Sequence, residues 1–270
     1  MIPSSVAPWS RCEPRRLAAV RGVLTDIDDT LTTAGRVPLG VIAALAALRE
    51  CGLPVLAVTG RPMGWSRRVA ARTPLAAVVA ENGSVALVRD GDEVRVDYVD
   101  SEPVRRANRE RLRAVAARIV AEIPGATLAQ DSAGRVTDIA VDHAEFAHLD
   151  PARIAEVVAL MKSEGMNATV SSIHVNGWFG AHSKLSGATW IVRRLLGRDL
   201  DAERDDWIYV GDSTNDEPMF AAFPLSVGVA NIADFADRLQ RWPAYVTQSD
   251  RGRGFVEIAE SLLAARSVTS

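Results

Sequence analysis

The chain has 270 residues, of which 48% are hydrophobic and 24% are charged, and its formal net charge is -3. This composition is typical of a globular protein long enough for one large domain or two smaller ones. A small negative net charge gives no reason to expect nucleic acid or an anionic membrane as a partner.

The cysteines and the N-terminus predict a cytoplasmic protein. Cys12 and Cys51 are too few for a disulfide framework, and they do not form a Cys-x-x-Cys pair. Residues 1–11 lack the continuous apolar core of a signal peptide. No apolar run approaches the roughly 20 residues needed to span a bilayer. We therefore expect a soluble protein in a reducing compartment.

Strands and helices alternate at the start of the chain. A short apolar strand at Val23–Leu24 precedes a segment from Pro38 to Cys51 whose apolar residues have helical spacing. A compact apolar run at 53–58, a helix at 62–72 and a strand at 75–80 continue the alternation. This order predicts an α/β fold with a parallel, doubly wound sheet.

The pattern changes after Glu81-Asn82-Gly83. Apolar runs at 85–88 and 94–98 flank a turn and predict a hairpin. The segments expected next are a helix at 103–122, a strand near 135–141, a helix at about 150–164 and paired strands around 168–175. We interpret residues 86–180 as an inserted α+β domain. The alternating pattern resumes at 184, so residues 1–85 and 181–270 form the predicted core.

Four polar motifs lie where predicted strands end or helices begin. They are Asp26-Ile-Asp28-Asp29-Thr30, Thr59-Gly60-Arg61, Lys184 and Gly211-Asp212-Ser213-Thr214-Asn215-Asp216. Ligands of open α/β sheets bind beyond the carboxyl ends of the strands, so one sheet edge can gather all four. The spacing of Asp26 and Asp28 suggests a nucleophile, a proton-transfer group and a seat for a divalent cation. The alternative is a pair of acidic turn residues.

In content and order, these motifs resemble the four signatures of the haloacid dehalogenase-like (HAD) superfamily of phosphotransferases. The resemblance covers residues 20–83 and 181–266. The inserted block resembles the α/β cap of the class IIB branch, which includes sucrose-phosphate phosphatase, phosphomannomutase and mannosyl-3-phosphoglycerate phosphatase. The resemblance implies a Rossmann-like catalytic core and a cap that roofs the site and selects the substrate.

The resemblance also implies a role for each acidic motif residue. Asp26 would attack phosphorus and form an aspartyl-phosphate. Asp28 would protonate the leaving oxygen and then take a proton from water. The implied cofactor is Mg²⁺, bound by the Asp26 carboxylate, the Asp28 main-chain carbonyl and the Asp212 carboxylate. Asp216 would orient the metal-bound waters.

Phosphate and substrate contacts are implied in the same way. Thr59, the Gly60 amide and Lys184 would hold phosphate oxygens, and Asn215 could donate a further hydrogen bond. Arg61 and Asn82 lie near the core motifs and are expected to contact the leaving group. In the inserted block, period-two alternation places Ser172, His174 and Asn176 on one face of a strand, and Asp138 and Asp142 on one face of another. These polar faces could bind sugar hydroxyls or could face solvent.

The expected function is Mg²⁺-dependent hydrolysis of the phosphomonoester of a small metabolite. A sugar phosphate or a phosphorylated glycoside is the expected substrate class. A phosphomutase or phosphotransferase, which passes the phosphoryl group to a sugar hydroxyl, is the alternative. A non-catalytic binding module on the same scaffold is a third hypothesis, and the intact Asp26, Asp28, Lys184 and Asp212 argue against it. The sequence does not indicate the oligomeric state.

Overall fold

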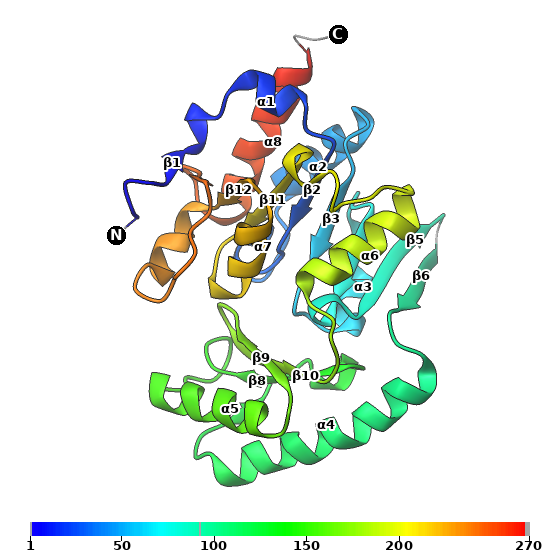
Figure 1. The fold of residues 1–270 in the computed structure, drawn as a ribbon, viewed down its shortest axis with the longest axis vertical. Coiled ribbons are helices and arrows are strands. Elements are labelled where there is room, and N and C mark those ends of the chain that lie inside the picture. The colour runs from blue at the N-terminus through cyan, green and yellow to red at the C-terminus, as the bar shows by residue number, and fades with distance from the viewer. Residues whose placement is uncertain (1, 92, 268–270) are drawn as a thin grey trace.

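The computed structural model describes residues 2–91 and 93–267. A sheet of nine strands forms the centre of the larger part of the molecule (Figure 1). In spatial order its strands are β1 (Ala7–Pro8), β13 (Tyr245–Val246), β12 (Leu225–Gly228), β11 (Trp207–Gly211), β2 (Gly22–Thr25), β3 (Val55–Val58), β4 (Ala77–Ala80), β5 (Val85–Asp90) and β6 (Glu93–Tyr98). The first seven are parallel, and β5 and β6 add an antiparallel edge. The predicted α/β doubly wound class is confirmed.

Helices cover both faces of this sheet. One layer contains α1 (Pro14–Ala18), α2 (Leu39–Glu50), α3 (Met63–Arg72) and α8 (Arg251–Ser267), and the other contains α6 (Lys184–Leu196) and α7 (Glu217–Ala222). Successive strand residues point to opposite faces. Val23 therefore packs in the first layer and Leu24 in the second. Short 3₁₀ helices complete the chain at Trp9–Arg11, Glu81–Gly83, Ser132–Gly134, Arg204–Asp206, Thr214–Asp216 and Ala230–Phe235.

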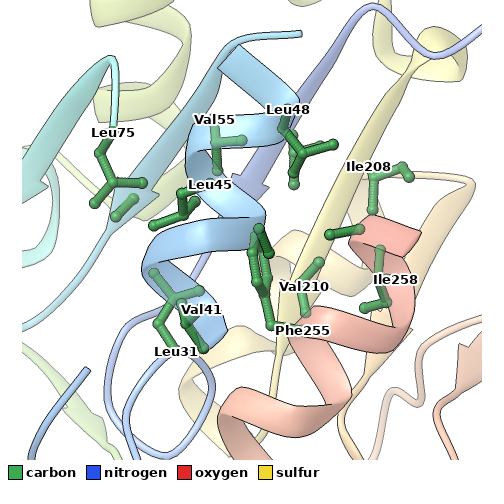
Figure 2. Packing of buried hydrophobic residues seen from close by; sticks show 14 of the residues in the cluster. Leu31, Val41, Leu45, Leu48, Val55, Leu75, Ile208, Val210, Phe255 and Ile258 are labelled. Atoms are coloured by element: carbon green, nitrogen blue, oxygen red, sulfur yellow. The ribbon is translucent and has the colours of Figure 1, made fainter. Parts of the chain in front are cut away.

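The packing of α2 against α8 closes the first layer. Figure 2 shows Phe255 of α8 between the two helices, with Leu45 of α2 and Val210 of β11 nearby. Phe255, Leu45 and Val210 are all fully buried. This packing holds the two neighbouring strands β11 and β2, whose carboxyl ends carry polar loops.

A second, smaller unit lies beyond the carboxyl ends of the parallel strands (Figure 1). It contains α4 (Glu102–Glu122), α5 (Pro151–Ser163) and an antiparallel sheet of β7 (Thr127–Leu128), β8 (Asp138–Asp142), β10 (His174–Trp178) and β9 (Asn167–Val170). Val141, Val175 and Met161 form its own apolar cluster with the two helices. We call residues 102–178 the cap and the remainder the core.

The hairpin β5–β6 belongs to the core rather than to the inserted block. The change of pattern in the sequence predicts a start of that block at residue 86, but β5 pairs with β4 and extends the large sheet. A two-stranded hairpin is marginally stable alone. In the large sheet, β5 pairs with β4, and Ala86 and Leu87 of β5 are completely buried, which stabilises the hairpin. The inserted unit therefore begins with α4.

Among the described helices, even the 21-residue α4 lacks the apolar length that a membrane crossing requires.

We expect Phe255→Ala to lower the free energy of unfolding by about 3 to 5 kcal/mol, because it leaves a cavity between α2 and α8. Leu39→Ala is the control, since Leu39 is 84% exposed and its truncation is expected to cost less than about 0.5 kcal/mol. Urea denaturation followed by tryptophan fluorescence measures both values. Equal losses in the two variants would contradict the packing described above.

Candidate active site

Asp26 and Lys184 form the centre of the site. Asp26 follows β2, and its amide donates to the carbonyl of Val210 in the neighbouring strand at 2.8 Å. Lys184 opens α6, and its Nζ donates to Asp26 Oδ1 and to Asp216 Oδ1, both at 2.7 Å. The side chains of Asp26 and Lys184 are each 6% exposed. One buried ammonium thus joins three of the four motifs.

Asp216 stabilises the loop after β11 through hydrogen bonds. Its Oδ1 accepts from Lys184 and from the hydroxyl of Tyr209, and its Oδ2 accepts from the amides of Asp212 at 3.0 Å and Ser213 at 3.2 Å. A Cβ at Gly211 would lie 2.5 Å from Asp216 Oδ2, so only glycine allows this carboxylate to pack against the strand end. Both oxygens of Asp216 are occupied by protein donors.

A group of carboxylates suited to a divalent cation lies here. Asp26, Asp212 and Asp216 each offer an oxygen within 4.8 Å of the others. Asp212 is 1% exposed, and its carboxylate oxygens accept hydrogen bonds from Thr30 Oγ1 at 3.4 Å and from Asn231 Nδ2 at 3.3 Å. Carboxylate oxygens are ligands that Mg²⁺ prefers. Because Asp216 already accepts four hydrogen bonds, Asp26 and Asp212 are the better placed ligands.

The electrostatics of this group favour an added cation. Burial raises the pKa of Asp26 to about 8, with Lys184 opposing the shift and repulsion from Asp216 reinforcing it. Burial also raises the pKa of Asp212 well above its ordinary value, and repulsion by Asp216 and Asp26 adds to this. The single charge of Lys184 therefore does not neutralise the three carboxylates.

Asp28 points away from the carboxylate group and toward the second motif. Arg61 Nε donates to both of its carboxylate oxygens at 2.9 Å. Burial raises the pKa of Asp28, although Arg61 opposes this shift. The Asp28 carboxylate is thus bound by Arg61 and does not belong to the group formed by Asp26, Asp212 and Asp216.

Arg61 links the core to the cap. Its Nη2 donates to Glu145 Oε1 at 2.8 Å, and its Nη1 lies 3.3 Å from Asp131 Oδ2. His174 Nε2 lies 2.9 Å from Glu145 Oε2. Burial raises the pKa of Glu145, but contacts with His174 and Arg61 outweigh this and lower it to about 2. Glu145 is therefore an anion held between the two domains.

The polar face of the cap sheet points to the core. Asn176 Nδ2 donates to the carbonyl of Gly60 and to Asp138 Oδ2, both at 3.3 Å, and Asn82 Nδ2 donates to Asp138 Oδ2 at 3.2 Å. His174, Asn176 and Asp138 are at most 3% exposed. Of the two arrangements left open by the sequence, the structure has the one in which these residues face the core.

The second motif lies under this face. Thr59 Oγ1 accepts from the amide of Arg61 at 3.0 Å, and the Thr59 amide donates to Val79 O at 2.8 Å. A Cβ at Gly60 would lie 3.1 Å from Asn176 Oδ1 and 3.3 Å from Asn82 Oδ1. Glycine at this position therefore allows the cap to approach the strand end.

Several residues of the site were not predicted. Asn231 follows β12 and donates to Asp212, so the rule that ligands gather at strand ends would have found it. Arg135 of the cap donates to the carbonyl of Gly60 and to Asp138, both at 2.9 Å. Arg135 and Glu145 lie in cap loops, and no signal in the sequence places those loops over the core. Asn215, which was predicted, accepts from Ser213 Oγ at 2.9 Å.

Comparisons with known proteins find similar sequences and similar folds. Residues 23–109 match the model of a family described as haloacid dehalogenase-like hydrolase. Phosphoglycolate phosphatases from Methanopyrus kandleri and Methanothermobacter thermautotrophicus are 28% and 27% identical to this chain. The alignments cover 89% and 88% of this chain and 96% of each relative.

Similar solved structures have the same fold. A Thermoplasma acidophilum protein has a TM-score of 0.67 and 17% identity, and covers 90% of this chain and 98% of its own. The sucrose-phosphatase from Synechocystis, solved with sucrose and phosphate, has a TM-score of 0.63 and 16% identity. That comparison covers 89% of this chain and 97% of the sucrose-phosphatase chain.

We expect Mg²⁺ binding to strengthen as the pH rises from about 6 to 8. The pKa of Asp26 is raised to about 8, so the metal-free site holds a proton that Mg²⁺ must displace. Titration calorimetry at pH 6, 7 and 8 measures the affinity, and two buffers of different ionisation enthalpy at pH 7 measure the protons released. Asp212→Asn is expected to lose Mg²⁺ binding, with Asp90→Asn, at an exposed position, as the control. Binding that is equally strong at all three pH values would contradict this prediction.

Proposed function

We propose that this chain is a haloacid dehalogenase-like phosphatase and that it hydrolyses the phosphomonoester of a small metabolite through an aspartyl-phosphate on Asp26. The observation that carries the proposal is the ammonium of Lys184, 2.7 Å from Asp26 and from Asp216, beside the carboxylate of Asp212. A nucleophile, a cation and a metal-binding pair are thereby brought together at one sheet edge.

In the proposed first step, the Asp26 oxygen not held by Lys184 attacks phosphorus. The bond from phosphorus to the ester oxygen breaks, and Asp28 gives its proton to the departing alcohol. Arg61 holds the Asp28 carboxyl through Nε and thereby fixes the direction of proton transfer. Lys184, Thr59, the Gly60 amide and Asn215 would bind the phosphate oxygens.

In the second step, water attacks the aspartyl-phosphate and Asp28 takes its proton. The bond from phosphorus to Asp26 breaks, and orthophosphate leaves. Bound by Asp26, the Asp28 carbonyl and Asp212, Mg²⁺ would supply the charge that lets a carboxylate approach a phosphate dianion. Asp216 would hold Lys184 and the loop after β11 in place throughout both steps.

The cap would select the substrate. The buried polar groups of His174, Asn176 and Asp138 face the core and support the predicted sugar phosphate or phosphorylated glycoside. The relatives named phosphoglycolate phosphatase support a smaller, acidic substrate. A panel of both classes, with Mg²⁺ present and absent and read by phosphate release, tests the proposal. We retain the cytoplasm as the proposed compartment, since Cys12 and Cys51 are both free thiols.

We expect Asp26→Asn to reduce phosphate release from p-nitrophenyl phosphate by about 10³-fold or more, because the amide is a poor nucleophile. Mass spectrometry of acid-quenched wild-type protein should find phosphate on the peptide that contains Asp26. Asp90→Asn is again the matched control and should retain full activity. Isomerisation of a hexose phosphate without net phosphate release would instead favour the phosphomutase alternative.

Asp28→Asn should affect poor leaving groups most. An alkoxide must be protonated as it leaves, so loss of the acid is expected to lower kcat for an alkyl phosphate by about 10² to 10⁴-fold. p-Nitrophenolate leaves without a proton and should show a much smaller loss in its formation step, measured by single-turnover kinetics. Equal decreases in rate for the two esters would contradict the assignment of Asp28 as the general acid.

A further inference from the structure

A cavity of about 250 Å³ lies between the cap and the core, next to the catalytic centre. Lys184, Asn82 and Asn215 line its core side, so the cavity adjoins residues expected to bind phosphate and the leaving group. The cap contributes Thr169 and Trp178 from its sheet and Lys162 from the last turn of α5. The volume is enough for a compact leaving group.

The charged groups of this cavity are all cations. Lys162 and Lys184 line it, and no aspartate or glutamate does so within the described part of the chain. These are also the only two lysines among the 31 basic residues counted as Lys and Arg, and all the others are arginine. Both lysines of the chain thus line this one cavity.

The two lysines differ in what they already bind. Lys184 is 6% exposed and its ammonium is shared by Asp26 and Asp216. Lys162 is exposed at the other end and, within residues 2–91 and 93–267, forms no ion pair. The hydroxyl of Thr169 is buried in the cavity wall and has no hydrogen-bond partner there. Among the described residues, the cap wall of the cavity therefore offers a cation without an ion pair and a hydroxyl without a hydrogen-bond partner.

The opposite side of the site has a different charge balance. There Arg61 is surrounded by Asp28, Glu145 and Asp131. A second anionic group on the substrate would be repelled by these carboxylates, whereas Lys162, which has no ion pair among the described residues, would attract it.

We propose that this cavity binds the leaving group and that Lys162 recognises a carboxylate on it. The inference rests on the proposed phosphatase activity and names its substrate class: phosphomonoesters of small hydroxy acids. A compact ammonium suits a space of this size, whereas the planar guanidinium of arginine is larger. Phosphate would lie at the Lys184 end and the carboxylate at the Lys162 end. Lys162 also lies in the last turn of α5, where a cation stabilises the helix through its dipole. The test distinguishes this structural role from recognition of a carboxylate.

The test compares Lys162→Met and Lys162→Arg on two substrates in the presence of Mg²⁺. For 2-phosphoglycolate, we expect Lys162→Met to raise KM about tenfold or more, because a charged hydrogen bond is lost. The KM for phenyl phosphate, which has no second anion, should change less than about twofold. Lys162→Arg should recover part of the loss. Arg109→Met removes another exposed cap cation, outside the cavity, and should leave both KM values unchanged.

A binding measurement makes the test independent of turnover. Calorimetry with phosphonoacetate and with orthophosphate, both with Mg²⁺, should show weaker binding of phosphonoacetate alone in Lys162→Met. Equal effects on the two ligands, or no effect on either, would overturn the role of Lys162. Hydrolysis of phenyl phosphate in that case would leave the proposed function standing. Lack of phosphate release from every ester would overturn the proposed function, and calorimetry would still decide whether a carboxylate is recognised.

Discussion

The repulsion among buried carboxylates at the end of β2 and β11 is the constraint on which the site depends. Asp26, Asp212 and Asp216 are each at most 4% exposed, and one lysine lies among them. Such a cluster is costly unless each charge is paired and hydrogen-bonded. The parallel sheet makes it possible, because β11 and β2 are neighbours and their loops approach each other. Backbone amides, the Tyr209 hydroxyl and the Lys184 ammonium satisfy Asp216, which leaves the other two carboxylates for a cation.

The cap is joined to the core by a second buried carboxylate. Glu81 is fully buried and accepts hydrogen bonds from the amide of Met63 in the core and from the amides of Val136 and Thr137 in the cap. Arg135 and Asn176 add bonds to the carbonyl of Gly60 close by. Breaking these contacts would leave polar groups without partners, so this edge of the cap stays on the core. The cap sheet is consequently part of the wall of the site.

Local pattern explains which features could be predicted from the sequence. Local patterns located α2, α3 and most strands of the large sheet within a few residues, and the rule for strand ends selected Asp26, Thr59 and Asp212. Period-two alternation grouped His174 with Asn176, but could not say whether solvent or the core lay opposite. The strand β1 has only two residues and therefore shows no periodicity. Its partner β13 lies near the other end of the sequence, so no local pattern predicts their pairing. Arg135 and Glu145 meet the core only through docking of the cap, which depends on tertiary contacts and not on local pattern.

The pKa of the Asp28 carboxyl depends on contact with the cap, because Arg61 binds both Asp28 in the core and Glu145 in the cap. Desolvation raises the pKa of Asp28, and Glu145 contributes in the same direction from the cap. Withdrawal of the cap would expose Asp28 to water and would remove Glu145 from Arg61, which would then pair with Asp28. Both changes favour the ionised form of Asp28. In the proposed mechanism, contact with the cap would therefore favour the protonated form of Asp28 that the departing alcohol needs, and withdrawal of the cap would weaken this preference.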